Sequence, residues 1–497
     1  MADAKGTDYE RLGTTKLSLL DAVAQSVGLI GPVFSAAFLI PLIAGFGASG
    51  KGAGIATPFA VILAAIGTFA IGWIVAQYAK RVHAAGSLYD YVSMGLGDRA
   101  GAWAGWVYYG GTTMLASAIA VLVGWFLRDG VLATFGIDGM LPTWAWSLIY
   151  AGLVFVVLAL GVQISTRLQL VLALVSAAVV LVFFIDVILN APTNSLRAFN
   201  PAEAPDLSGL LFGVLYGVLI FVGFESAANL AEETAEPKRA IPRAVLLSVV
   251  IVSVYYVIAA YAHIAGFGFD ATVLTDPAVA NAGPLFVLGA PESAGGLYGG
   301  GSDAMLKVLL VVVLLDVMAV GLGAATASTR GIFALARDRR IPGALATTRR
   351  GNPIAAAGFV AVISAAWVVL TKASTDLFSN GIQIDFQTPH EIAVFQWLST
   401  FGGFAIMLVY GVMALGAFPG LRDHPNRAGV AIAGVIGIAI ALGALYGGYY
   451  NQPVPFDLVW KAVLAWAVLG VIVAFAVGGR ERAASALGDL HSPQGAT

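Results

Sequence analysis

Residues 19–43 read LLDAVAQSVGLIGPVFSAAFLIPLI, and Asp21 is the only charged side chain in this run. About 20 apolar residues in a helix cross the roughly 30 Å of hydrocarbon in a bilayer, so the run predicts a membrane span. It is too long for the apolar core of a secretory signal and lacks a cleavage pattern, so we expect it to be retained. Gly31-Pro32 stands at its centre. Proline donates no N–H and clashes with the carbonyl four residues back, so we expect the helix to open there.

The rest of the chain repeats this apolar character. Hydrophobic residues make up 59 % of the sequence and charged residues only 11 %, against about 25 % charged residues in soluble domains. Twelve runs are long enough to span a bilayer. The sequence therefore predicts an all-α polytopic membrane protein with 12 transmembrane helices, and it excludes a set of soluble domains.

The distribution of Lys and Arg predicts how these helices are oriented. With a cytoplasmic N-terminus, 20 of the 26 basic residues lie in the inward segments and six in the outward ones. Cytoplasmic loops carry the excess of Lys and Arg in membrane proteins. We therefore expect a multi-pass protein of the cell membrane with both termini in the cytoplasm.

Several classes of function lack the residues that they need. The chain has no cysteine and five scattered histidines, so we expect no disulfide, no metal site and no other cofactor. No basic patch has interleaved aromatic residues, which argues against a nucleic-acid partner, and no paired-acid or His-rich motif indicates an enzyme. The loop 45–51 resembles a phosphate loop but has Gly52 where Ser or Thr is required, which argues against an ATP-driven pump.

A second irregular helix is expected five spans after the first. The sixth apolar run contains Gly213, Gly217 and Gly223, followed by Glu225. Paired discontinuous helices in two halves of a chain indicate a transporter substrate site. Five spans begin on one side of the membrane and end on the other, so a second set of five must be inverted.

This spacing predicts the organisation of the whole chain. We expect tails at 1–18 and 479–497, five-span repeats at 19–190 and 208–416, and two further helices within 429–478. Buried acids cost about 3 kcal/mol on insertion scales, so Glu225 and Asp316 are candidates for gating or for carrying a proton.

Three stretches resemble a known family. Residues 221–243 read FVGFESAANLAEETAEPKRAIPR, residues 328–342 read STRGIFALARDRRIP, and residues 86–92 read GSLYDYV. They are similar to the sixth span with its following loop, the end of the eighth span, and the re-entrant segment after the second span of amino acid–polyamine–organocation (APC) superfamily permeases. The resemblance extends over roughly residues 17–350.

The resemblance implies a LeuT-like fold, a 5+5 inverted repeat with broken helices 1 and 6, and transport of amino acids or amines without ATP. It also implies that exposed backbone in those two helices holds the amino and carboxylate groups of the substrate. The matching positions are Ile30, Gly31, Pro32, Val33, Phe34, Phe221, Gly223 and Phe224. Tyr108 and Thr112 would flank the same cavity. Glu225 matches an acid that some members use at the inner gate or for sensing protons.

The chain departs from the family pattern at two positions. The first span of relatives reads Gly-Ser-Gly or similar, whereas this chain has Gly31-Pro32-Val33, and Pro32 removes one N–H from the place where a carboxylate would be held. Recognition of a carboxylate is then weakened or shifted to neighbouring amides. Ser176 stands where proton-coupled relatives often have lysine, which leaves sodium, a proton on Glu225, or plain exchange as ways of driving transport.

The leading hypothesis is thus a secondary active transporter that moves amino acids by alternating access. An amine or polyamine permease is the alternative, and a sensor built on a transporter fold is another. A channel is disfavoured because no repeated filter sequence is visible. The sequence predicts two partners, a small amino acid or amine substrate and the lipid bilayer, and leaves the coupling ion and the oligomeric state open.

Overall fold

A computed structural model of the chain describes residues 17–46, 51–82, 84–137, 141–292, 298–373, 390–450, 452 and 456–476. The predicted C-terminal tail and residues 1–16 of the predicted N-terminal tail lie outside these ranges. Within them the structure has 12 helices long and apolar enough to cross a membrane. The predicted class, an all-α polytopic membrane protein, is confirmed.

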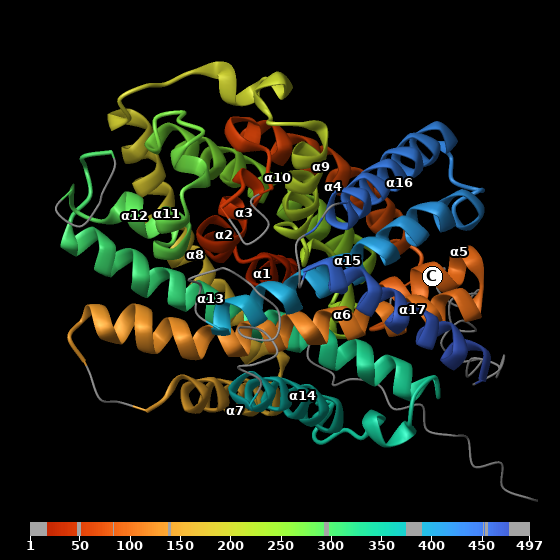
Figure 1. Ribbon diagram of the computed structural model, residues 1–497. Coiled ribbons are helices and arrows are strands. Elements are labelled where there is room, and N and C mark those ends of the chain that lie inside the picture. Colours follow the sequence, from red (N-terminus) through yellow and green to blue (C-terminus); the bar gives the residue numbers. More distant parts are fainter. Residues whose placement is uncertain are drawn as a thin grey trace, which may run out of the picture.

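The spans follow one another in chain order, and the longest described connection, between α10 and α13, contains short helices (Figure 1). The first five spans are Leu19–Ala44, α4 (Thr57–Ala79), α6 with η3 (Asp98–Leu132), α7 (Thr143–Leu160) and α8 (Val162–Asn190). The next five are Leu207–Glu233, α10 (Pro237–Gly266), α13 (Asp303–Arg337), α14 (Ile354–Ala373) and α15 (His390–Gly420). The last two are α16 (Arg427–Tyr449) and α17 (Val459–Ala476).

The first span is broken where Gly31-Pro32 predicts a break. Helix α1 (Leu19–Ile30) ends at Gly31, and the chain resumes as α2 (Pro32–Phe34), the π-helix η1 (Ser35–Leu39) and α3 (Ile40–Ala44). The π-helix ends just before Pro41, which has no N–H to donate to a regular helical bond. Asp21, the lone charge of this span, caps the start of α1, because its carboxylate accepts the Ser18 N–H at 2.9 Å.

The sixth span is broken in the same manner. Helix α9 (Leu207–Leu219) ends in a turn over residues 220–223, and the span continues as the 3₁₀-helix η6 (Phe224–Glu233). A 3₁₀-helix of ten residues is unusual, because such helices rarely exceed three or four residues. Both irregular helices therefore lie where the sequence predicts them.

Contacts between helices follow the symmetry of an inverted repeat. Each of spans 2, 3 and 4 packs against its counterpart five spans later, in the pairs α4 with α10, α6 with α13, and α7 with α14. The halves of the broken spans pair reciprocally, since α1 packs on η6 and α3 packs on α9. Span 5 contacts spans 8 and 1, and span 10 contacts spans 3 and 6. The breaks thus meet at the centre of a LeuT-like fold.

Other elements surround this core. In Figure 1, α7 and α14 run side by side along one flank, and α16 and α17 lie towards the right of the view, where both pack on α15. The helix α5 (Leu88–Leu96) follows span 2 and packs on α6 and α15. The short helix α12 (Pro284–Gly289) covers the end of the first span, with Phe286 against Phe38 at 6.4 Å between ring centroids.

Candidate functional site

The break in span 1 places Gly31 against span 8. Gly31 has φ +59°, a left-handed conformation that glycine adopts readily, and a Cβ there would lie 1.9 Å from Val320 Cγ2. Only glycine fits, because both the backbone angle and the space exclude a side chain. The Ile30 carbonyl loses its usual partner at the break and accepts the Ser35 hydroxyl at 3.2 Å instead.

The break in span 6 is built in a similar way. Gly223 has φ +118°, and a Cβ would lie 2.7 Å from Leu29 Cγ in span 1. The freed carbonyl of Ile220 accepts the Tyr256 hydroxyl of α10 at 2.8 Å. Irregular backbone at membrane depth requires such partners, because no water is present to supply them.

Two serines tie the broken spans to each other. The Ser26 hydroxyl of span 1 donates to the Phe224 carbonyl at 2.8 Å, and the Ser226 hydroxyl of span 6 lies 3.2 Å from the Gln25 carbonyl. The Ser226 hydroxyl also lies 2.7 Å from the Gly223 carbonyl. Sequence reasoning missed both serines. Their positions, each a few residues from a predicted break, were the available signal.

Asp316 of span 8 caps the second half of span 1. Its Oδ2 accepts the N–H of Val33 at 2.9 Å and the N–H of Phe34 at 2.7 Å. In an unbroken helix these two amides would bond to the carbonyls of residues 29 and 30. The predicted candidate Asp316 therefore joins the predicted positions Val33 and Phe34, which the sequence did not connect.

Glu225 lies at the break of span 6 and is fully buried. The Tyr108 hydroxyl of α6 donates a hydrogen bond to its Oε1, and the Gly223 N–H donates to its Oε2 at 3.1 Å. Tyr410 of α15 also interacts with this carboxylate. The structure thus brings together three of the predicted residues, Tyr108, Gly223 and Glu225, in one cluster that links spans 3, 6 and 10.

Three other predicted residues, Thr112, Phe221 and Phe224, contact side chains of neighbouring helices. Thr112 accepts the Ser328 hydroxyl at 2.9 Å, which joins span 3 to span 8. Phe221 packs edge-on against Tyr256, and Phe224 packs against Tyr410. All three side chains are buried between helices. Their contact with a substrate stays a prediction.

A small cavity lies beside the break of span 1. Its volume is about 30 Å³, enough for one or two waters. Of the predicted residues, Ile30 and Phe34 line it, together with residues from spans 3, 6, 8 and 10 that include Leu115, Val222, Val320, Ala324 and Ser399. The structure is therefore a closed state in which the broken helices pack tightly.

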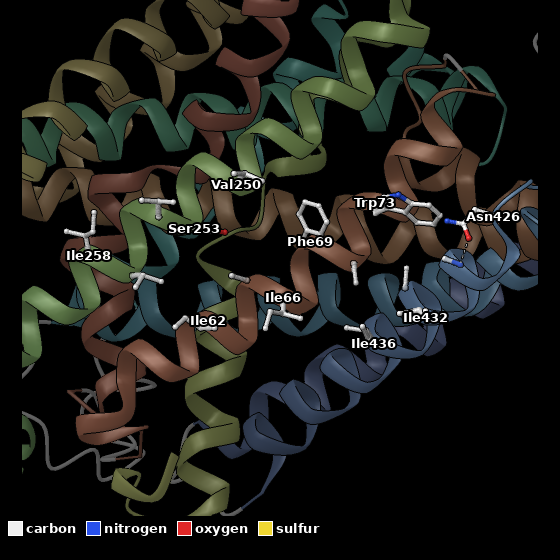
Figure 2. Close-up of a pocket in the computed structure, with 16 residues that line it drawn as sticks. Ile62, Ile66, Phe69, Trp73, Val250, Ser253, Ile258, Asn426, Ile432 and Ile436 are labelled. Atoms are coloured by element: carbon white, nitrogen blue, oxygen red, sulfur yellow. Dashed lines mark hydrogen bonds between the residues drawn. The ribbon is translucent and has the colours of Figure 1, made fainter. Parts of the chain in front are cut away.

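A second, larger cavity is a different feature. A groove of about 790 Å³ lies between α4, α10 and α16 (Figure 2), and its wall is mostly aliphatic and aromatic. Ile66 and Phe69 are among the exposed apolar residues there, as expected for a surface that faces lipid. The Ser253 hydroxyl is bonded to the Val249 carbonyl of its own helix at 2.6 Å. The groove therefore offers little for recognising a polar solute.

Two buried ion pairs close one end of the core. Arg330 pairs with Glu233 at 2.8 Å, with side chains 3 % and 2 % exposed, and Arg337 pairs with Glu232 at 2.8 Å. Glu232 also accepts the Ala85 N–H at 2.9 Å. These contacts join span 8 to the end of span 6 and to the segment before α5. The four side chains lie in motifs that carry the resemblance, but sequence reasoning gave them no role.

A polytopic helical fold with an inverted repeat and two broken helices that meet at its centre defines the class as a membrane transporter. Comparison with known proteins agrees. The amino acid permease family matches residues 26–429, and the chain belongs to this family.

Individual relatives cover most of the chain at low identity. A methylthioribose transporter of Bacillus subtilis is 21 % identical over 85 % of this chain and 86 % of its own length. An uncharacterised transporter of Mycobacterium tuberculosis is 28 % identical, with 86 % of each chain covered. A branched-chain amino acid permease of Bacillus subtilis is 22 % identical over 87 % of this chain and 88 % of its own. The protein is thus a permease and not an enzyme.

Proposed function

We propose that the protein is a secondary active transporter that moves a small solute with an amino group, an amino acid or an amine, by alternating access. The meeting of the two breaks is the observation that carries this proposal. Backbone freed at membrane depth is tolerated only where protein buries it or where it lines a cavity, and in transporters with broken helices the substrate site lies at such breaks, between the repeats near the midplane. Gly31 and Gly223 place backbone without side chains at that position.

The ion pairs at one end of the core fit a gated site. The pairs Arg330–Glu233 and Arg337–Glu232 hold spans 6 and 8 together at one end. We propose that this end faces the cytoplasm, together with both termini, because most Lys and Arg lie on that side. Opening that end would require both pairs to separate.

The names of the relatives bear on the choice of solute. A branched-chain amino acid permease supports amino acids. A methylthioribose transporter indicates that this scaffold also serves a solute that is not an amino acid. The names of the relatives therefore do not decide the substrate of this chain, which depends on its own residues. The proposal includes both amino acids and amines.

Uptake into proteoliposomes tests the proposal. Labelled amino acids and labelled amines are supplied separately, each with no gradient, with a proton gradient and with a sodium gradient. The proposal expects accumulation above equilibrium for one solute class with one gradient. Saturable binding without any uptake would contradict it and indicate a sensor.

A further inference from the structure

The anion-binding position at the break of span 1 is already filled by the protein. The positive end of a helix and its free N–H groups attract an anion. After the break, Pro32 has no N–H, so Val33 and Phe34 supply the first two free amides. Both donate to Asp316 Oδ2. A solute carboxylate finds these donors occupied.

The other carboxylate oxygen of Asp316, Oδ1, does not take part in this cap. Asp316 is fully buried, and its Oδ1 has no hydrogen-bond partner among the described residues. Among the residues that the structure describes, no Lys or Arg forms an ion pair with Asp316. A buried carboxylate oxygen without a donor is costly and is seldom left so without a functional reason.

Asp316 is not itself among the residues that line the small cavity, but it lies on the helix face that borders it. Asp316, Val320 and Ala324 are spaced by four residues on α13 and so share one face of the helix, and the last two line the cavity. The Phe34 side chain lines it as well, and Tyr255 of α10 lies close enough to interact with Asp316. A carboxylate with aromatic neighbours is a combination that attracts an ammonium group.

We propose that Asp316 stands in place of the carboxylate of an amino acid, and that the solute is an amine without an α-carboxylate whose ammonium group binds Asp316 Oδ1. This inference rests on the proposed transport function and narrows its substrate class. One charge then performs two tasks, because Oδ2 holds the broken helix and Oδ1 holds the solute. An amino acid would bring a second carboxylate close to Asp316, and like charges repel there.

Matched pairs of solutes test the inference. Each labelled amino acid is compared with the amine obtained by its decarboxylation, for example leucine with 3-methylbutylamine and lysine with cadaverine. The side chain is the same within a pair, so only the carboxylate is compared. We expect at least one amine to be taken up and to stabilise the purified protein against heat. Its parent amino acid should need about tenfold higher concentrations for the same effects.

Two substitutions at one position make the test sharper. Asp316→Asn retains an oxygen for the two amides but replaces the free oxygen with a donor, so amine affinity should fall by about 10- to 100-fold. Asp316→Ala frees the amides of Val33 and Phe34, so preference should shift from the amine towards the amino acid. Asp186→Asn removes an acid near the end of span 5 and serves as the control. A shift of preference, unlike a loss of both activities, does not result from misfolding.

The outcomes separate the two proposals. Uptake of amino acids with inert amines would overturn the inference and leave the transport function standing. Loss of ion dependence in Asp316→Asn with unchanged solute preference would also overturn it and assign Asp316 to the coupling ion. If no amine of the panel stabilises the protein and none is taken up, the inference is also overturned. Stabilisation by an amine without its uptake would contradict only the transport function.

Discussion

Arg330 of span 8 forms a bidentate pair with Glu233 at the end of span 6, with Nε to Oε2 at 2.8 Å and Nη2 to Oε1 at 3.4 Å. Both side chains are almost entirely buried. Two opposite charges in a low-dielectric interior attract strongly, but either charge buried without its partner destabilises the folded protein. The contact therefore holds this end of the core closed only while both partners are present.

Breaking this pair should destabilise the closed state. Arg330→Ala leaves Glu233 buried and unpaired, which costs about 3–5 kcal/mol. We expect a lower melting temperature and little uptake. The double variant Arg330→Glu with Glu233→Arg restores opposite charges and should recover part of both properties. If the exchanged pair is no better than the single change, the contact has a role other than attraction between the two charges.

The cluster of Glu225 and Tyr108 leads to a prediction about coupling. Glu225→Gln retains oxygen and nitrogen atoms for hydrogen bonds at the break but cannot take up a proton. If Glu225 carries the coupled proton, solute exchange without a gradient persists and proton-driven accumulation is lost. Tyr108→Phe removes the hydroxyl partner and leaves the carboxylate, so accumulation should weaken and not vanish. Equal accumulation by wild type and Glu225→Gln would limit Glu225 to a structural role.

Gly223 should resist even the smallest side chain. A Cβ there meets Leu29 at 2.7 Å on a backbone with φ +118°. Gly223→Ala should therefore cost about 1–3 kcal/mol and reduce transport, as measured by thermal stability and uptake. Gly152 of α7 has no atom within 4 Å of its Cβ position, so Gly152→Ala is the matched control. If the two variants behave alike, the close contact between spans 1 and 6 at Gly223 is not required for stability or transport.

The orientation of the chain can be measured without background, because it contains no cysteine. Ala202 and Ala344 are exposed alanines at opposite ends of the fold, after span 5 and after span 8. We expect Ala202→Cys to react with an impermeant thiol reagent added outside intact cells, and Ala344→Cys to react only after permeabilisation. The reverse pattern would invert the proposed topology.

The sequence was sufficient for the architecture, for a physical reason. Membrane spans are decided by length and hydropathy along the chain, and the break at Gly31-Pro32 is local as well. The twelve spans and both breaks could therefore be predicted. The family resemblance added Tyr108, which the fold brings to Glu225.

The partners across the core could not be predicted in the same way. Asp316 is 282 residues from Phe34 and 283 from Val33, and no periodicity indicates that its carboxylate bonds to their amides. Ser26 and Ser226 also show their roles only when the two breaks face each other. The ring partners of Phe221 and Phe224, which are Tyr256 and Tyr410, could not be predicted either, and the substrate contact that the resemblance implies for the two phenylalanines stays a prediction.

The most direct test of the central claim, that the solute binds where the broken helices meet, is protection of a single cysteine. Ala324 lines the small cavity and Ile436 lines the lipid-facing groove. In proteoliposomes, the rate of modification by a permeant maleimide is measured for Ala324→Cys and Ile436→Cys with and without a transported solute. The account predicts slower modification at position 324 and an unchanged rate at position 436. Protection at position 436 alone, or at neither position, would contradict it.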